Sequence, residues 1–390
     1  MTSMAWGFHI PAVVARFLPS TVGVRSWYST QIKLWNFYPQ NSIPTNKLGR
    51  RIFLSRYTNS QMGRDNIKLM DTKTRANFRL CNVAGYKTDL LEIHAQNPAF
   101  HALFIPGNPG VVSFYTDFLE SLYELLGGGA SVTAIAHVSH TEKNWEHGRL
   151  FSLQEQIEHK LNFVEQELQG VEVPIVLVGH SIGAYISMEM FKRSPDKVRY
   201  CVFLYPFLAV NTKSSTQSLI RKISASPLIC AVLSSIAGMV PIWTSKFLVT
   251  KTLGKPWSSS AVDALCTHVL QYHSMRNVLF MAMTEFKELS ETPDWDFIRE
   301  KRGQIAFLFG IDDHWGPLHL FEEISKQVPD AVLAVERQGH SHTFSCTEAG
   351  SLWVAQHVAS LIKNHMLKSR PDLTSTGARM LDGRGYQTID

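Results

Sequence analysis

The feature that most constrains the fold is a serine flanked by glycines, G-H-S-I-G at residues 179–183, directly after the apolar run at residues 174–178. That run suits a parallel strand buried on both faces, and residues 184–191 carry apolar side chains at helical spacing. A strand that enters a helix through G-x-S-x-G is a nucleophile elbow. A Cβ at Gly179 or Gly183 would collide with backbone in so tight a turn. The alternative interpretation is an ordinary strand-turn-helix whose serine only packs.

An acid that could orient a histidine follows the next buried strand. In chains with this elbow the order is serine, then Asp or Glu, then histidine. Residues 304–309 (QIAFLF) predict a buried strand, and Asp312 and Asp313 lie just past its end. We expect Asp313 to be the orienting acid because a G-x-x-D spacing from Gly310 is typical of such hydrolases, and Asp312 is the alternative.

The general base is expected in the loop after the last predicted strand, residues 331–335. It must take the proton of Ser181 and return it to the leaving group, which requires a pKa near neutrality. We expect His340 because it directly follows a glycine suited to a sharp loop. His342 is the alternative, since it could face the same way if the loop were extended.

An oxyanion hole needs two backbone N–H groups aimed at the developing negative charge. One is expected from Ile182, the residue after the serine, and the other from a loop that follows an early strand. The predicted strand at residues 102–105 is followed by P-G-N-P-G, which has proline where related loops carry histidine. Asn108 is the candidate second donor, and an ordinary proline-glycine turn is the alternative.

The charge distribution and the cysteine pattern exclude several classes of protein. The 390 residues suffice for one large α/β domain or two small ones. No acidic residue precedes Asp65, whereas the remainder carries 30 basic and 33 acidic residues, which argues against a nucleic-acid-binding domain. The five cysteines are scattered without CxxC or metal spacing, so we expect a reducing compartment, no disulfide framework, no metal and no cofactor.

Strands alternate with helices from Tyr86 onward, which predicts an α/β domain at residues 86–365 with a mostly parallel sheet covered on both faces. One helix is marked by a capping box at Ser152 and Glu155. Residues 1–64 have the basic, acid-poor composition of a transit peptide, with a disordered leader as the alternative. Residues 368–390 are expected to be disordered.

Residues 206–297 lack strand patterns and predict a helical cap inserted over the site. Within them, residues 227–243 are uncharged and end in Trp243, with basic residues on both sides. Such a segment could enter a lipid monolayer or cover an acyl pocket, and the two roles are compatible. Gly238 and Pro241 interrupt it, which makes it marginal as a transmembrane helix.

Three stretches together resemble a known family: FIPGNPG at 104–110 followed by Phe114 and Tyr115, QIEHKL at 156–161, and VGHSIG at 178–183. The chain resembles the lipid droplet-associated hydrolases, in a plant-like version, over roughly residues 86–365. The resemblance implies an α/β-hydrolase fold and places a triad on Ser181, Asp313 and His340. It also implies an ester hydrolase on lipid droplets that is linked to neutral-lipid storage, without specifying the ester.

The resulting prediction is a serine ester hydrolase for lipid-like esters, located on lipid droplets or the cytoplasmic side of the endoplasmic reticulum. The leader keeps a plastid or a mitochondrion open as alternatives. An acyltransferase would use the same triad with an alcohol in place of water. A droplet-surface or tethering protein with weak hydrolase activity is the alternative from another class.

Overall fold

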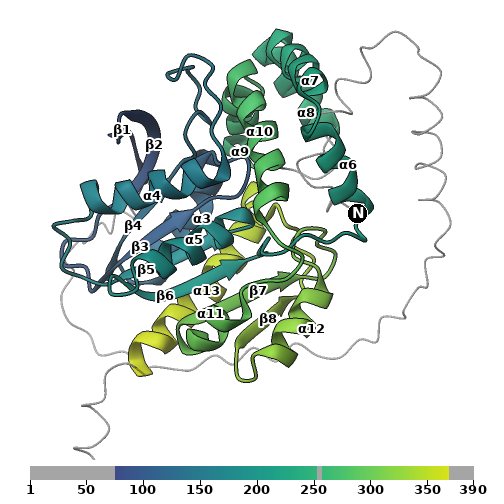
Figure 1. Cartoon of the computed structure of the whole chain (residues 1–390). Helices are drawn as coiled ribbons and strands as arrows, with labels where there is room; N and C mark the ends of the chain where they lie inside the picture. The colour runs from purple at the N-terminus through teal and green to yellow at the C-terminus, as the bar shows by residue number, and fades with distance from the viewer. Residues whose placement is uncertain (1–74, 253–256, 369–390) are drawn as a thin grey trace, which may run out of the picture. The chain divides into compact units, whose positions relative to one another are not determined.

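The computed structural model describes residues 75–252 and 257–368 (Figure 1). The predicted leader at residues 1–64 lies outside this part, as does the predicted tail apart from Lys368. Within the described residues the central sheet has eight strands in the order β1-β2-β4-β3-β5-β6-β7-β8. Their bounds are β1 Asn77–Val83, β2 Tyr86–Ile93, β3 Phe100–Ile105, β4 Ala130–Ile135, β5 Ile175–His180, β6 Val198–Leu204, β7 Ile305–Gly310 and β8 Val332–Glu336.

The sheet is parallel from β4 through β8, whereas β2 pairs antiparallel with both β1 and β4. Every residue of β3, β4, β5 and β7 is buried, as expected for parallel strands that helices cover on both faces. Successive side chains along these strands point to opposite faces of the sheet. Two separate apolar cores result, one on each face.

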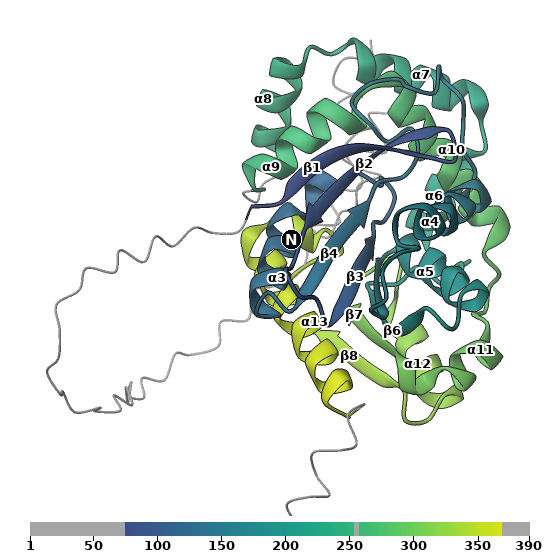
Figure 2. The same cartoon turned by 90° about the vertical axis from the view of Figure 1, so that its left-hand side faces the viewer.

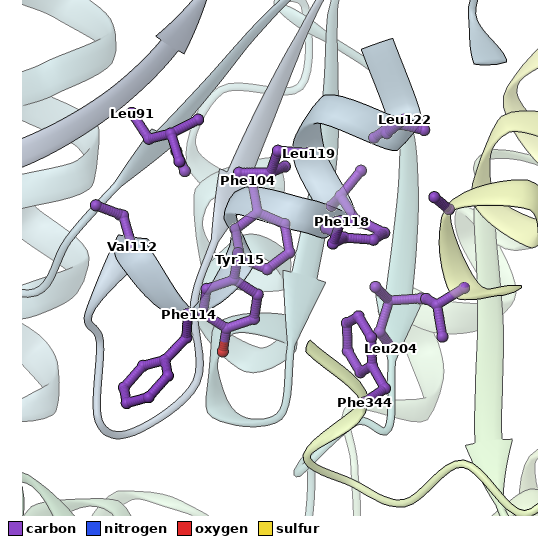
Figure 3. Close-up of a cluster of buried hydrophobic side chains, with 14 of the residues drawn as sticks. Leu91, Phe104, Val112, Phe114, Tyr115, Phe118, Leu119, Leu122, Leu204 and Phe344 are labelled. Atoms are coloured by element: carbon purple, nitrogen blue, oxygen red, sulfur yellow. The ribbon is translucent and has the colours of Figure 1, made fainter. Parts of the chain in front are cut away.

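Helices α3 (Thr116–Leu125) and α13 (Glu348–Lys368) pack on one face of the sheet. In that core Phe104, Phe118 and Phe344 lie around Tyr115, with Leu204 beside Phe344 (Figure 3). The opposite face is covered by α4, α5, α11 and α12. These helices span Leu153–Glu167, Ile182–Arg193, Trp295–Glu300 and Leu318–Gln327.

The predicted capping box is confirmed. The Ser152 side chain accepts a hydrogen bond from the Glu155 backbone N–H, and the Glu155 carboxylate accepts one from the Ser152 N–H. These two bonds satisfy donors that have no partner inside the helix, so α4 begins at Leu153.

Between β6 and β7 the described chain forms helices and no strand. They are α6 (Ser215–Ser224), α7 (Pro227–Met239), α8 (Ile242–Thr252), α9 (Ser259–Ala264), a π-helical turn (Leu265–Val269), α10 (Tyr272–Glu288), α11 and a short 3-10 helix (Arg302–Gln304). In both views α7, α8, α9 and α10 gather at the top, away from α11 and α12 (Figures 1 and 2). This insert corresponds to the cap expected at residues 206–297.

The predicted start of the domain at Tyr86 is wrong, because β1 already begins at Asn77 and pairs with β2. Only the far end of β1 is buried, so its sequence lacks the apolar alternation of a half-buried strand. Arg79 joins it to β2 through an ion pair with Glu92 at 2.8 Å. At the other end of the domain, α13 continues to Lys368 instead of stopping near residue 365.

Candidate active site

Ser181 lies at the turn between β5 and α5 with φ +56° and ψ −123°. A non-glycine residue in such a conformation costs on the order of 1–3 kcal/mol, so neighbouring structure must hold it there. Its N–H donates to the Leu204 carbonyl at 3.0 Å, and its carbonyl accepts from the Phe207 N–H at 3.1 Å. These two bonds fix the serine beyond the end of the sheet.

The two elbow glycines are required by close backbone contacts. A Cβ on Gly179 would lie 2.4 Å from the Gly183 carbonyl oxygen. A Cβ on Gly183 would lie 2.2 Å from the Ile105 carbonyl oxygen, at the end of β3. Real Cβ atoms do not approach oxygen so closely, so β3, β5 and α5 can meet here only without side chains.

Asp313, three residues after β7, contacts His342 in the loop after β8. The distance from its Oδ2 to His342 Nδ1 is 2.9 Å, and its Oδ1 accepts a hydrogen bond from the Trp315 N–H at 2.9 Å. Both side chains are buried, whereas Asp312 is exposed. Because a carboxylate only accepts, Nδ1 carries the ring proton and the neutral ring keeps Nε2 as an acceptor.

The structure brings His342, and not the expected His340, into contact with Asp313. His340 is half-buried, and its ring lies 6.0 Å from that of Trp353 on α13. The loop after β8 turns at Gly339 but returns to the elbow only at Phe344. The Phe344 side chain is buried among His180, Tyr205 and Phe118. The signal that could have identified His342 is the apolar anchor two residues after it.

Ser181 and His342 line the same pocket. Its other walls are mostly apolar and come largely from the cap. They are formed by Pro109, Phe207, Ile220, Ile223, Leu233, Val269, Met275, Val278, Leu279, Ala282 and Trp315. The pocket therefore suits a long apolar group that ends at the serine.

The loop at residues 106–110 lies directly against the elbow. A Cβ on Gly107 would lie 2.9 Å from the Cβ of Ser181, so only glycine allows this approach. Asn108 lines the pocket beside Ser181. In the described part of the chain, neither the Asn108 N–H nor the Ile182 N–H donates to a protein acceptor. Both predicted oxyanion donors are thus free for a ligand, and Ile182 is at the N-terminus of α5, where such donors are expected.

Two residues without a predicted role, Tyr115 and His180, connect the loops of the site. The Gly107 N–H donates to the Tyr115 hydroxyl at 3.2 Å, and that hydroxyl is 2.8 Å from His180 Nδ1. His180 Nε2 lies 3.0 Å from the His342 carbonyl oxygen. A carbonyl only accepts, so Nε2 carries the His180 proton and Nδ1 accepts from Tyr115. Burial lowers the pKa of His180, which keeps the ring neutral.

Glu285 on α10 is a third residue that sequence reasoning missed. Its Oε1 accepts a hydrogen bond from Asn108 Nδ2 at 3.0 Å, and the same amide group donates to the Val278 carbonyl at 2.9 Å. Burial raises the pKa of this carboxyl to about 8, although the bond from Asn108 opposes the rise. Glu285 follows the apolar stretch at residues 278–283 of α10, and an acid so close to an apolar stretch is the sequence feature that marks it.

The far end of the 106–110 loop is held by two buried histidines. The Gly110 N–H donates to His140 Nδ1 at 2.8 Å, and the Gly110 carbonyl accepts from the His137 N–H at 2.9 Å. Burial lowers the pKa of both rings. Among residues 75–252 and 257–368, no group of three or more His, Cys, Asp or Glu side chains could hold a metal ion.

The family model described as "Lipid-droplet associated hydrolase" matches residues 98–345. The chain is 27% identical over 280 residues to the lipid droplet-associated hydrolase of Gallus gallus, covering 66% of this chain and 83% of the relative. It is 24% identical over 295 residues to that of Dictyostelium discoideum, covering 73% of this chain and 94% of that relative. The family-model match spans the elbow, Asp313, His342 and the whole of the insert at residues 206–297.

Solved structures share the architecture. An epoxide hydrolase from Vigna radiata superposes with a TM-score of 0.53 at 15% identity, over 74% of this chain and 99% of that one. A thermophilic esterase from Thermogutta terrifontis gives a TM-score of 0.51 at 12% identity, over 74% and 99%. At such low identity these likenesses show the fold alone, which is the predicted α/β-hydrolase fold.

Proposed function

The chain belongs to the lipid-droplet associated hydrolase family, and from that premise we propose that it hydrolyses lipid-like carboxylic esters with Ser181 as the nucleophile. The observation that carries the proposal is the Asp313–His342 pair, together with a pocket that both His342 and Ser181 line. The apolar walls of that pocket support an ester with a long hydrocarbon chain.

In the proposed reaction, Ser181 Oγ attacks the ester carbonyl while His342 Nε2 accepts the hydroxyl proton. Asp313 holds the ring with Nδ1 protonated and stabilises the imidazolium that forms. The backbone N–H groups of Ile182 and Asn108 stabilise the tetrahedral oxyanion. Collapse expels the alcohol, which takes the proton from His342. Water then attacks the acyl-serine by the same steps and releases the acid.

Labelling by a fluorophosphonate probe tests this proposal, because the probe reacts with a serine that a neighbouring base has activated. We expect labelling of the native chain and its loss in Ser181→Ala and His342→Ala. His340→Ala is the matched control and should label normally, since that ring contacts Trp353. A folded native chain without labelling, or loss in His340→Ala but not in His342→Ala, would contradict the assignment. Hydrolysis of p-nitrophenyl esters of rising chain length then tests the apolar pocket.

We further propose that α7 and α8 provide the lipid-surface contact of this hydrolase. Leu228, Met239 and Trp243 are 75%, 80% and 75% exposed, and Phe247 is 61% exposed. The opposite side of α7 contributes Leu233 to the pocket, so one helix serves both roles considered for residues 227–243. In the described segments no single helix is long and apolar enough to span a bilayer. Among these segments, the pair formed by α6 and α7 reaches that length and composition, and the two helices are bent by 91° relative to each other.

Flotation with triolein droplets coated by phosphatidylcholine tests the surface proposal. The double variant Leu228→Asp/Trp243→Asp should lose most droplet binding because both side chains project into solvent. Leu367→Asp on α13 is the matched control, since Leu367 is 70% exposed on another element. Unchanged binding of the double variant, or equal loss in the control, would refute this surface. Fluorophosphonate labelling of each variant reports whether the site remains intact.

A further inference from the structure

Two polar side chains in the apolar pocket have no place in the proposed triad. They are Asn108 from the oxyanion loop and Glu285 from the cap helix α10, and both line the pocket with Ser181. Glu285 is only 3% exposed, and no cation pairs with it among the described residues. A buried acid without a counter-charge is costly in its ionised form, which favours the neutral carboxyl and hydrogen-bonding partners for it.

The orientation of the Asn108 amide follows from its partners. The Val278 carbonyl can only accept, so the Asn108 group 2.9 Å from it is the NH₂ and not the oxygen. Its second N–H faces Glu285 Oε1 at 3.0 Å. The amide oxygen Oδ1 must then point away from both partners. It is buried, and within the described structure it accepts no hydrogen bond.

The proton of Glu285 is placed by the same reasoning. Burial favours the neutral carboxyl, whose pKa is raised to about 8. The Oε1 atom already accepts from Asn108, and a carboxylic acid accepts best at its carbonyl oxygen, so the proton resides on Oε2. Asn108 Oδ1 is therefore an acceptor, and Glu285 Oε2–H a donor, for which the described residues supply no partner. The two side chains touch each other at the pocket wall.

We propose that Asn108 and Glu285 form a subsite for a free hydroxyl group in the alcohol portion of the lipid ester, so that the substrate class is the partial glyceride type. A hydroxyl donates to one group and accepts from the other, which satisfies both at once. The long acyl chain matches the apolar walls, which assigns the hydroxyl to the alcohol portion. A fully apolar ester would leave both groups without partners. A site built to hydrogen-bond a hydroxyl therefore discriminates strongly against a substrate that lacks one.

The subsite rests on the proposed function for its substrate, but its test uses binding alone. We would measure dissociation constants of 1-O-octylglycerol and of octyl propyl ether, which lacks the hydroxyls. Neither ether can be hydrolysed, so the result does not depend on the triad. The Trp315 indole lines the pocket and provides a fluorescence signal. We expect the native chain to bind the glycerol ether about 10- to 100-fold more tightly.

Glu285→Leu should remove this preference, whereas Glu285→Gln should keep most of it because an amide still donates and accepts. Glu288→Leu is the matched control, an exposed glutamate on the same helix. If Glu285 only held α10 in place, Glu285→Leu would weaken both ethers equally and leave their ratio unchanged. That result would overturn the proposal, as would equal binding of the two ethers by the native chain.

Discussion

His180 Nε2 donates a hydrogen bond to the His342 carbonyl across 3.0 Å, so the residue just before the nucleophile holds the loop of the candidate base. The other nitrogen of the same ring accepts from Tyr115, which accepts in turn from Gly107. Only one arrangement of protons satisfies all three contacts. The second residue of G-x-S-x-G therefore sets the distance between the serine, the base and the oxyanion loop.

Tyr115→Phe tests this connection. The change leaves the Gly107 N–H and His180 Nδ1 buried without partners, which should lower the free energy of unfolding by about 1–3 kcal/mol. We expect kcat toward a p-nitrophenyl ester to fall about tenfold with little change in KM, because the hydroxyl contacts catalytic loops and not the pocket. Urea unfolding and steady-state kinetics measure the two effects. Tyr123→Phe, on the helix α3 that follows Tyr115, is the control, and an equal loss of kcat there would contradict the role.

Asp313→Asn should reduce kcat on the order of 10⁴-fold, as loss of the orienting carboxylate does in comparable triads. An amide could present its N–H to His342 Nδ1 and select the wrong tautomer of the ring. Asp312→Asn is the natural control, because that side chain is exposed and one residue away. Ester hydrolysis measured for both variants decides between the two aspartates. A larger loss in Asp312→Asn would reverse the assignment.

Local sequence patterns were enough to predict the strands that are buried on both faces of the sheet. The apolar runs of β3, β5 and β7, and the strand-turn-helix around Ser181, were all predictable from the sequence. The exposed start of β1 was not, because its stability comes from pairing with β2 and not from its own pattern. A buried strand requires apolar residues in its own sequence, whereas the pairing of an edge strand requires few particular residues.

His340 was preferred to His342 for a different reason. His340 and His342 are two residues apart, so an extended loop would point both side chains the same way, and the glycine before His340 favoured that residue, whereas His342 is the one that contacts Asp313. The structure separates them by where the loop is anchored, since Phe344 packs against rings from β5, the turn after β6 and α3. Glu285 was missed because its partner, Asn108, lies 177 positions earlier in the chain. The packing of Phe344 and the Asn108–Glu285 hydrogen bond are long-range contacts, which no short stretch of sequence contains.

Gly183→Ala should prevent normal folding or lower the free energy of unfolding by about 3 kcal/mol or more. Its Cβ would meet the Ile105 carbonyl oxygen at 2.2 Å, and neither backbone can move without disturbing β3 or α5. Gly170→Ala is the control, because a Cβ there meets nothing within 4 Å and the change should stay within about 0.5 kcal/mol. Soluble yield and thermal unfolding of both variants measure the difference. Equal stability of the two would show that the elbow tolerates a side chain.

Glu285 should make stability fall as pH rises. Its pKa is raised from the ordinary value of 4.5 to about 8 in the folded chain, so between these values the folded state binds more protons than the unfolded one. The free energy of unfolding then decreases with pH, by up to about 1.4 kcal/mol per unit from this group. Below pH 4.5 the contribution of Glu285 is fully present, and above about 8 it has been lost.

Glu285→Gln isolates that contribution, because the amide cannot ionise while other groups titrate as before. Relative to the native chain, the variant should gain stability steadily from about pH 4.5 to pH 8 and level off above. Urea unfolding of both proteins at half-unit steps of pH measures this difference. A difference that stays constant across the range would mean that Glu285 is ionised throughout. The neutral donor required for the hydroxyl subsite would then be absent, so one titration tests both the electrostatics of the pocket and the basis of its selectivity.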